Sequence, residues 1–334
     1  MSSDIMKNSS QASPQTMSQR DLVRRALAHQ ATPRPPYCIQ FTPQAMEILK
    51  PHMGDLPLED FVANDARIVF GPWWGWKDLG EDWQLPDTPQ TPERFFKAGK
   101  LDDFRRSLGE IRRQGNPYIV STYYGSHFEK ANFARGIENF LADMAADPPF
   151  ARKLLTSIVD RNLVMIEEAL RLEEIDAVLL GGDWGSQQGL LMSPQAWDDL
   201  IRPGEQREYD LIKAYGKDVW VHSCGKIDVL IPRLIEMGVD VLNPVQPEVM
   251  DLASLKRDFG SRITFWGGLG TQRILPRGTP QQVKEEARQV RNLMSADGGY
   301  VFAPSQFIQD DVPVENVLAL LEVAREPLGD HPAK

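Results

Sequence analysis

The chain contains 334 residues, of which 42% are hydrophobic and 25% are charged, so it is long enough to bury a large core and is not disordered as a whole. Its 47 acidic residues outnumber its 37 Lys and Arg residues, and the formal charge of −10 disfavours binding to nucleic acid or to an anionic membrane. No apolar run is long enough to span a bilayer and no secretion signal opens the sequence, so we expect a cytoplasmic protein.

The predicted elements alternate between strands and helices. Residues 1–17 are rich in Ser, Gln and Met without apolar periodicity, which predicts a flexible, disordered leader before a single domain over 18–328. Within that domain, short runs rich in Val, Ile and aromatic residues alternate with stretches of helical period, as in a parallel sheet crossed by helices. Eight such runs are predicted strands: 36–41, 67–71, 117–123, 176–182, 218–223, 239–245, 262–268 and 300–305.

The helices between them carry clear signals. Apolar residues recur at three- and four-residue steps over 148–172, and helix starts are marked by Ser193 before Pro194, Thr279 before Pro280, and Asp311 with Pro313. Eight parallel strands with helical crossovers predict an α/β fold of the (β/α)8 (TIM) barrel type. The alternative is a doubly wound open sheet, but no glycine-rich phosphate turn follows the first strand.

In such a barrel the residues that follow each strand meet at one mouth, where catalysis takes place. Here these residues are polar or aromatic while the strand bodies are apolar, which indicates a functional site. The predicted substrate contacts are Gln40, Tyr123, Trp184, Gln187, Asn243, Gln246, Trp266 and Gln306.

The most specific motif is VHSCG at 221–225, because His222 and Cys224 lie two residues apart at the end of a strand. Imidazole nitrogen and thiolate sulfur are preferred zinc ligands, and a catalytic zinc needs only three protein ligands. The alternative is a buried histidine beside a small apolar cysteine. The glycine-rich loop at 181–189 supplies Asp183, which could bind metal, act as a base, hold substrate or simply form a turn.

Two aromatic segments are further candidates. In the segment 121–136, Tyr123, Tyr124 and His127 could donate to a substrate, with Glu129 nearby, although tyrosines also bury well without function. The tryptophan-rich segment 72–86 is either a lid over the substrate or a satellite core under a long loop.

The sequence resembles the uroporphyrinogen decarboxylase superfamily in five segments between about residue 115 and residue 325. They are FEKANFARGIENFLADM, GGDWGSQQGLLMSPQAW, VHSCGKIDVLIPRLIEMGVDVLNPVQPE, RITFWGGLGTQRILPRGTPQQVKEEAR and GGYVFAPSQFIQDDVPVENVLAL. The resemblance implies a (β/α)8 barrel, in agreement with the strand count. It does not by itself determine the reaction, because the superfamily contains both porphyrinogen decarboxylases and methyltransferases that act with corrinoid proteins.

The residues at the motif positions favour the methyltransferase branch. Porphyrinogen decarboxylases grip substrate carboxylates with arginines in a first-strand pattern like MRQAGR, whereas YCIQFTPQAM stands here without arginine. The methyltransferases bind zinc through a His-x-Cys pair and a distant cysteine near the last strand. His222 and Cys224 match the pair, but the stretch after the last strand reads APSQFIQ and lacks the cysteine. The remaining candidates for the third ligand are Asp183, which we prefer, Cys38, Ser305 and Gln306, whose amide oxygen is a poor zinc ligand.

We therefore expect a metal-dependent methyltransferase or demethylase. His222, Cys224 and Asp183 would hold a divalent ion, zinc first among the candidates, which activates a small aromatic, thiol or ether substrate. The expected catalytic residues are Asp183, His127 and Tyr124. The resemblance also implies a corrinoid on a separate partner protein, and a homo-oligomer is compatible with the sequence. The alternatives are a metal-free decarboxylase of a small carboxylated substrate, with Asp183 or His127 as the acid, and a binding protein that has lost turnover.

Overall fold

The computed structural model describes residues 17–71, 100–123 and 125–328. Its seven strands are β1 (Ala66–Phe70), β2 (Tyr118–Tyr123), β3 (Ala177–Gly181), β4 (Asp218–His222), β5 (Val241–Val245), β6 (Thr264–Leu269) and β7 (Tyr300–Pro304). The helices up to β4 are α1 (Gln19–Leu27), α2 (Pro43–Leu49), α3 (Leu58–Val62), α4 (Lys100–Arg113), α5 (His127–Arg135), α6 (Ile137–Ala146), α7 (Pro148–Leu170), α8 (Pro194–Ala196) and α9 (Arg202–Ala214). After β4 come α10 (Ile231–Glu236), α11 (Leu252–Phe259), α12 (Ile274–Arg277), α13 (Pro280–Ser295) and α14 (Val314–Arg325).

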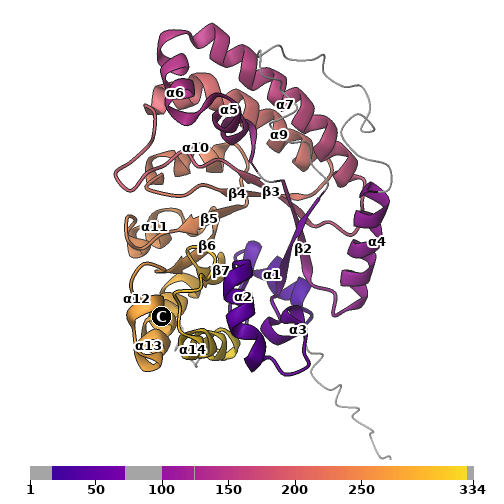
Figure 1. Ribbon diagram of the computed structural model, residues 1–334, viewed down its shortest axis with the longest axis vertical. Coiled ribbons are helices and arrows are strands. Elements are labelled where there is room, and N and C mark those ends of the chain that lie inside the picture. Colours follow the sequence, from indigo (N-terminus) through magenta and orange to yellow (C-terminus); the bar gives the residue numbers. More distant parts are fainter. Residues whose placement is uncertain (1–16, 72–99, 124, 329–334) are drawn as a thin grey trace, which may run out of the picture.

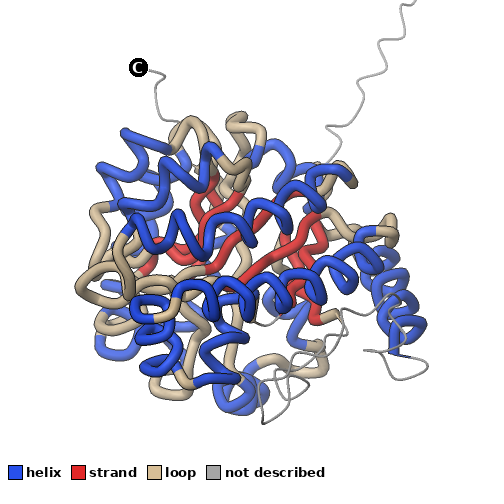
Figure 2. The backbone as a smooth tube through the Cα atoms, turned by 90° about the horizontal axis from the view of Figure 1, so that it is seen from above, coloured by secondary structure: helices blue, strands red, loops and turns tan. Residues whose placement is uncertain are grey.

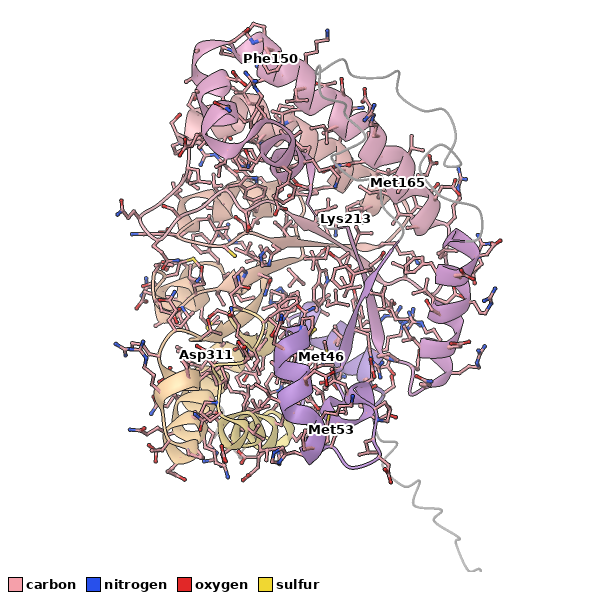
Figure 3. The ribbon with its side chains drawn as sticks, viewed as in Figure 1. Met46, Met53, Phe150, Met165, Lys213 and Asp311 are labelled. Carbon is pink, nitrogen blue, oxygen red and sulfur yellow. The ribbon has the colours of Figure 1, made fainter. Side chains whose placement is uncertain are left out.

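The strands form one parallel sheet in which every strand pairs with its neighbour in the sequence, in the order β1 to β7. Parallel neighbours require crossover connections, and helices supply them on the outside of the sheet (Figure 1). The sheet curls, so that the strands lie inside a shell of helices (Figure 2). Met46 on α2 and Met165 on α7, both labelled in Figure 3, mark helices on two sides of the strands. The predicted α/β fold is confirmed, with its helices arranged around a curled parallel sheet.

Seven of the eight predicted strands are confirmed and form one curled parallel sheet, whereas a full barrel of eight strands is not confirmed. The segment predicted as the first strand, 36–41, does lie beside β7, where Cys38 N donates to Phe302 O at 3.1 Å. It forms only two isolated parallel bridges, however, at Tyr37 and Phe41. The expectation that this segment forms a regular strand is therefore wrong.

Side-chain bonds explain the irregularity of this segment. On the side that faces β1, the amide group of Asn64 bonds both the N–H and the carbonyl of Ile39, each at 2.8 Å. These backbone groups are then not available to a strand ladder. Pro35 and Pro36 also lack the N–H groups that a ladder needs.

The predicted helix starts are confirmed where a side chain caps the backbone. Ser193 accepts a hydrogen bond from Ala196 N, and Thr279 forms a reciprocal capping box with Gln282 at the start of α13. The predicted helix over 148–172 is α7, which ends at Leu170. The last helix, α14, starts directly after Pro313, and Asp311 does not cap it.

Large side chains fill the inside of the curled sheet. Every second residue of a strand points inward, and these residues form an apolar cluster of their own. Within it, the ring of Trp220 stacks on Tyr118 at 5.8 Å and meets Trp266 edge to face at 5.3 Å. Because the interior is filled up to this level, a ligand can enter only above it, at the carboxyl ends of the strands. Among the helices described, none has the length and apolar character needed to cross a membrane.

Candidate metal centre and active site

The register of the central strands aligns three inward-facing positions in one layer. Gly181 on β3 pairs with His222 on β4, and His222 pairs with Asn243 on β5. The amide of Asn243 donates to the carbonyl of Trp266 at 3.2 Å, so its oxygen accepts the 2.6 Å bond from Nδ1 of His222. With the proton on Nδ1, the Nε2 atom of His222 carries a free lone pair.

This lone pair meets the other two predicted ligands. His222 Nε2 lies 3.3 Å from Cys224 Sγ and 3.5 Å from Asp183 Oδ1, and the candidate ligand atoms of the three residues all lie within 4.8 Å of one another. The carboxylate of Asp183 also accepts a hydrogen bond from Cys224 N at 2.9 Å. The backbone of Asp183 has φ of +44°, a left-handed conformation that is uncommon outside glycine and is typical of functional turns.

Two glutamines hold the loop that follows β4. The amide of Gln306 donates to Cys224 Sγ at 2.8 Å, while the buried Gln246 accepts from Gly225 N at 2.6 Å. Gly225 itself has φ of +85°, and a Cβ atom there would lie 2.6 Å from the backbone of Gly185. The loop that carries Cys224 is thus packed directly against the loop that carries Asp183.

Glu129 has no assigned role among the residues predicted from the sequence, yet it faces this site. The position of Gly181 explains how it gets there, because a Cβ atom at Gly181 would lie 2.2 Å from Oε2 of Glu129. The missing side chain leaves room for the carboxylate over the end of β3. The sequence signal for Glu129 is its position in the first turn of α5, the helix that follows β2, because such positions lie near the carboxyl ends of the strands.

Burial and negative charge shape the electrostatics of the site. Burial and the neighbouring Asp183 carboxylate raise the pKa of the Cys224 thiol to about 12. The same two causes raise the pKa of Glu129 to about 7. Among the described residues that line the cavity, none is Lys or Arg. The basic side chain that acts on Glu129 is Lys130, which is not among the lining residues: it donates to the carbonyl of Gly125, and burial lowers its pKa.

A cavity of about 450 Å³ opens beside the three candidate ligands. Four of the predicted substrate contacts line it: Gln40, Asn243, Trp266 and Gln306. Further lining residues are Thr42, Ile68, Phe70, Thr122, Gly125, Glu129, Leu179, Gly181, Phe307 and Gln309.

The other predicted contacts lie elsewhere. Trp184 is fully buried and packs edge to face on Trp197 at 5.3 Å, so it belongs to the core rather than to the cavity wall. Gln187 is exposed outside the cavity, and Gln246 holds the Cys224 loop from behind. The side chain of Tyr123, all of Tyr124 and the tryptophan-rich segment 72–86 lie outside the described residues.

The structure does not bring His127 to the cavity. It starts α5, and because each residue turns a helix by about 100°, Glu129 faces the cavity while His127 points toward α9. There its Nδ1 lies 3.4 Å from Glu205 and 3.5 Å from Glu208, and all three side chains are fully buried. Gly204 leaves room for the ring, since a Cβ atom there would lie 2.8 Å from Nε2 of His127.

Cys38, the alternative third ligand, is also absent from the set of candidate ligands found among the described residues. It is fully buried under the cavity, its carbonyl accepts from Nε1 of Trp266 at 3.1 Å, and burial raises the pKa of its thiol. It behaves as a small core residue.

Comparison with known proteins gives one matching family and relatives of two activities. Residues 104–327 match the family model for uroporphyrinogen decarboxylase (URO-D). A methylated-thiol–coenzyme M methyltransferase of Methanosarcina mazei is 20% identical over 259 residues, which cover 73% of this chain and 67% of the relative. A uroporphyrinogen decarboxylase of Nitratiruptor sp. is 22% identical over 275 residues, which cover 80% of this chain and 74% of the relative.

Among solved structures, a methyltransferase from Methanosarcina mazei superposes with a TM-score of 0.70. The match covers 92% of this chain and 98% of that one at 16% identity. It shows that the two chains share a fold.

Proposed function

The chain belongs to the uroporphyrinogen decarboxylase family, and from this premise we propose that it is a metal-dependent methyltransferase or demethylase of a small molecule. Family membership confirms the resemblance identified in the sequence. One observation carries the proposal: the lone pair of His222 Nε2 lies within 3.5 Å of both Cys224 Sγ and Asp183 Oδ1 at the edge of a cavity.

The residues present fit a divalent ion, and zinc is our candidate. Imidazole nitrogen, thiolate sulfur and carboxylate oxygen are the three ligand types that zinc uses, and three protein ligands leave one position for substrate. The hydrogen bond from His222 Nδ1 to Asn243 is the orienting contact that zinc-binding histidines usually make. When bound, zinc supplies Lewis acidity, which lowers the pKa of a thiol or phenol or makes an ether oxygen a better leaving group.

The chain's own residues prepare the site in three ways. Asn243 holds the His222 ring in one tautomer and one orientation. The N–H donated by Gln306 stabilises negative charge on the Cys224 sulfur, which favours the thiolate over the thiol. Asp183 completes the ligand set and fixes the Cys224 backbone at the same time.

The cavity determines what can be bound. Its volume of about 450 Å³ suits a small molecule. Porphyrinogen carboxylates would need cationic partners, and none is found among the described lining residues, so a decarboxylase is the less favoured activity. We extend the proposal to a methyl carrier: a corrinoid on a separate protein, as the family resemblance implies.

Metal analysis and methyl transfer together test the proposal. We expect about one zinc per purified chain, lost in His222→Ala and in Cys224→Ser. His52→Ala is the matched control for an exposed histidine, and Cys38→Ala is the control for a cysteine outside the ligand set; both should retain the metal. Methyl transfer from methylated donors to cob(I)alamin or to a thiol is followed on the same samples. Metal-free protein with full activity, or chelator-resistant release of carbon dioxide, would overturn the proposal.

A further inference from the structure

We propose that the cavity beside the metal centre binds a small organic cation of the methylated ammonium class, and this inference rests on the proposed function. Three features of the cavity carry it: the sign of its charge, the aromatic side chains in its wall, and the neutral character of its other polar groups.

The charge of the cavity favours a cation whether or not the ion is bound. With a divalent ion in place, the Cys224 thiolate and the Asp183 carboxylate balance its two positive charges, and the Glu129 carboxylate leaves an excess of one negative charge. Without the ion, Asp183 and Glu129 still face the cavity, and a bound cation would favour the ionised form of Glu129, whose pKa burial and Asp183 raise to about 7. In each state the lining residues that the structure describes include no Lys or Arg to offset them.

Glu129 is held where its charge can act on a ligand. Its carboxylate lies over Gly181, at the same level of the sheet as His222, and a Cβ atom at Gly181 would occupy its place. Burial weakens solvent screening at this position, so an opposite charge in the cavity interacts more strongly than it would at the surface.

Aromatic rings supply the second feature. Trp266, Phe70 and Phe307 line the cavity, with exposed fractions of 2%, 62% and 37%. Quaternary and methylated ammonium groups bind to aromatic faces through the ring quadrupole, and tryptophan binds them best.

The remaining polar side chains are neutral. Gln40, Thr42, Thr122, Gln306 and Gln309 line the cavity and can bond a hydroxyl or carbonyl on the ligand. A carboxylate or phosphate would meet the Glu129 charge without a compensating cation from any of the described lining residues, which disfavours anionic ligands.

Three ligands of one shape and different charge test the inference. Choline is a cation, 3,3-dimethylbutan-1-ol is its neutral carbon isostere, and 3,3-dimethylbutanoate is a related anion. Titration calorimetry on the metal-free full chain at 150 mM salt should show choline binding at least about tenfold more tightly than the alcohol, with the anion weakest. With zinc bound, only choline and the alcohol are compared, because a carboxylate can occupy the open zinc position. Equal affinity for choline and the alcohol, or tighter binding of the anion, would overturn the inference.

Variants separate recognition by the cavity from general attraction to an acidic protein. Glu129→Gln should lower choline affinity about tenfold and leave the alcohol unchanged, and Glu129→Asp should restore part of the loss. Glu138→Gln removes the same charge from the exposed surface of α6 and should change neither affinity. Trp266→Phe, which keeps an aromatic ring, should weaken choline binding less than Trp266→Leu does. Loss of choline selectivity together with normal zinc content would reject this inference alone, whereas absence of zinc would reject the proposed function.

Discussion

Acidic side chains have basic partners at the amino ends of the strands and none among the described cavity-lining residues at the carboxyl ends. At the amino ends, Asp65, Asp176 and Asp240 each directly precede a strand, and each is paired with a basic side chain: Arg34 and Arg20 at 2.6 Å, and Lys213, labelled in Figure 3, also at 2.6 Å. At the carboxyl ends, Asp183 and Glu129 face a cavity without Lys or Arg among its described lining residues. The first group stabilises the fold, and the second leaves its charge available to a ligand.

The three paired carboxylates also each accept a hydrogen bond from a backbone N–H. Asp65 accepts from Tyr37 N at 3.0 Å, Asp176 from Ile119 N at 2.9 Å, and Asp240 from Val219 N at 2.6 Å. Each carboxylate thus bonds a backbone N–H near the start of the preceding segment or strand. A buried N–H left without a partner would be costly, so these acids have a structural reason to be there.

The largest expected effect is a loss of stability when one of the paired acids at the amino ends of the strands is removed. Asp176→Ala should lower the free energy of unfolding by about 3 kcal/mol, because it leaves the mostly buried Arg112 and the N–H of Ile119 without their carboxylate. Urea denaturation measures the loss. Asp183→Ala is the contrasting variant and should change stability by less than about 1 kcal/mol in metal-free protein. Similar losses in the two variants would refute the distinction between the two ends.

The next prediction concerns the candidate metal ligands at the carboxyl ends of the strands and tests them through Asn243, which orients His222. Asn243→Ala should weaken zinc affinity by about 10- to 100-fold, because the His222 ring loses the bond that fixes its tautomer. Competition with a chromophoric chelator measures the affinity. Asn64→Ala, which removes an amide that bonds the backbone of Ile39, should leave it unchanged. Unaltered zinc affinity in Asn243→Ala would show that the hydrogen bond between His222 and Asn243 does not orient a zinc ligand.

A smaller effect depends on pH. The pKa of Glu129 is raised to about 7 from 4.5, so the folded chain holds this proton more tightly than the unfolded chain does. Stability from this group is therefore present below about pH 4.5 and is lost as pH rises through about 7. Glu129→Gln lacks this loss, so metal-free Glu129→Gln should gain about 2 kcal/mol relative to the unsubstituted chain between pH 5 and pH 8. Urea denaturation at both pH values checks it, and a difference that stays constant with pH would contradict it.

The smallest effect lies within the paired group. Arg24 contacts Asp176 at 3.2 Å with a side chain that is 52% exposed, whereas Arg112 contacts it at 2.5 Å from a mostly buried position. Arg24→Ala should therefore cost less than about 1 kcal/mol, and Arg112→Ala should cost more. Thermal unfolding of the two variants ranks them, and the reverse order would show that burial does not govern these pairs.

Short apolar runs predicted most of the strands because parallel strands covered by helices are buried on both faces and read as near-continuous runs of Val, Ile, Leu and aromatic residues. Seven of the eight predicted strands follow this rule, and α7 follows the helical one. The segment 36–41 has the same apolar pattern, but Asn64, some 25 residues away, takes the backbone bonds that would make it a strand. The domain limits, the corrinoid partner and the oligomeric state stay predictions.

Local spacing alone determined that His222 and Cys224 lie at the same strand end, because only one residue separates them in the chain. Strand register, which depends on the whole sheet, set Asn243 behind the His222 ring and Gly181 beside it. The rotation of α5 about its axis determined that Glu129 faces the cavity while His127 faces a buried pair of glutamates. Packing in the core determined that Trp184 does not line the cavity. These outcomes required the tertiary structure, since register and helix rotation are determined by contacts between segments that are distant in the chain.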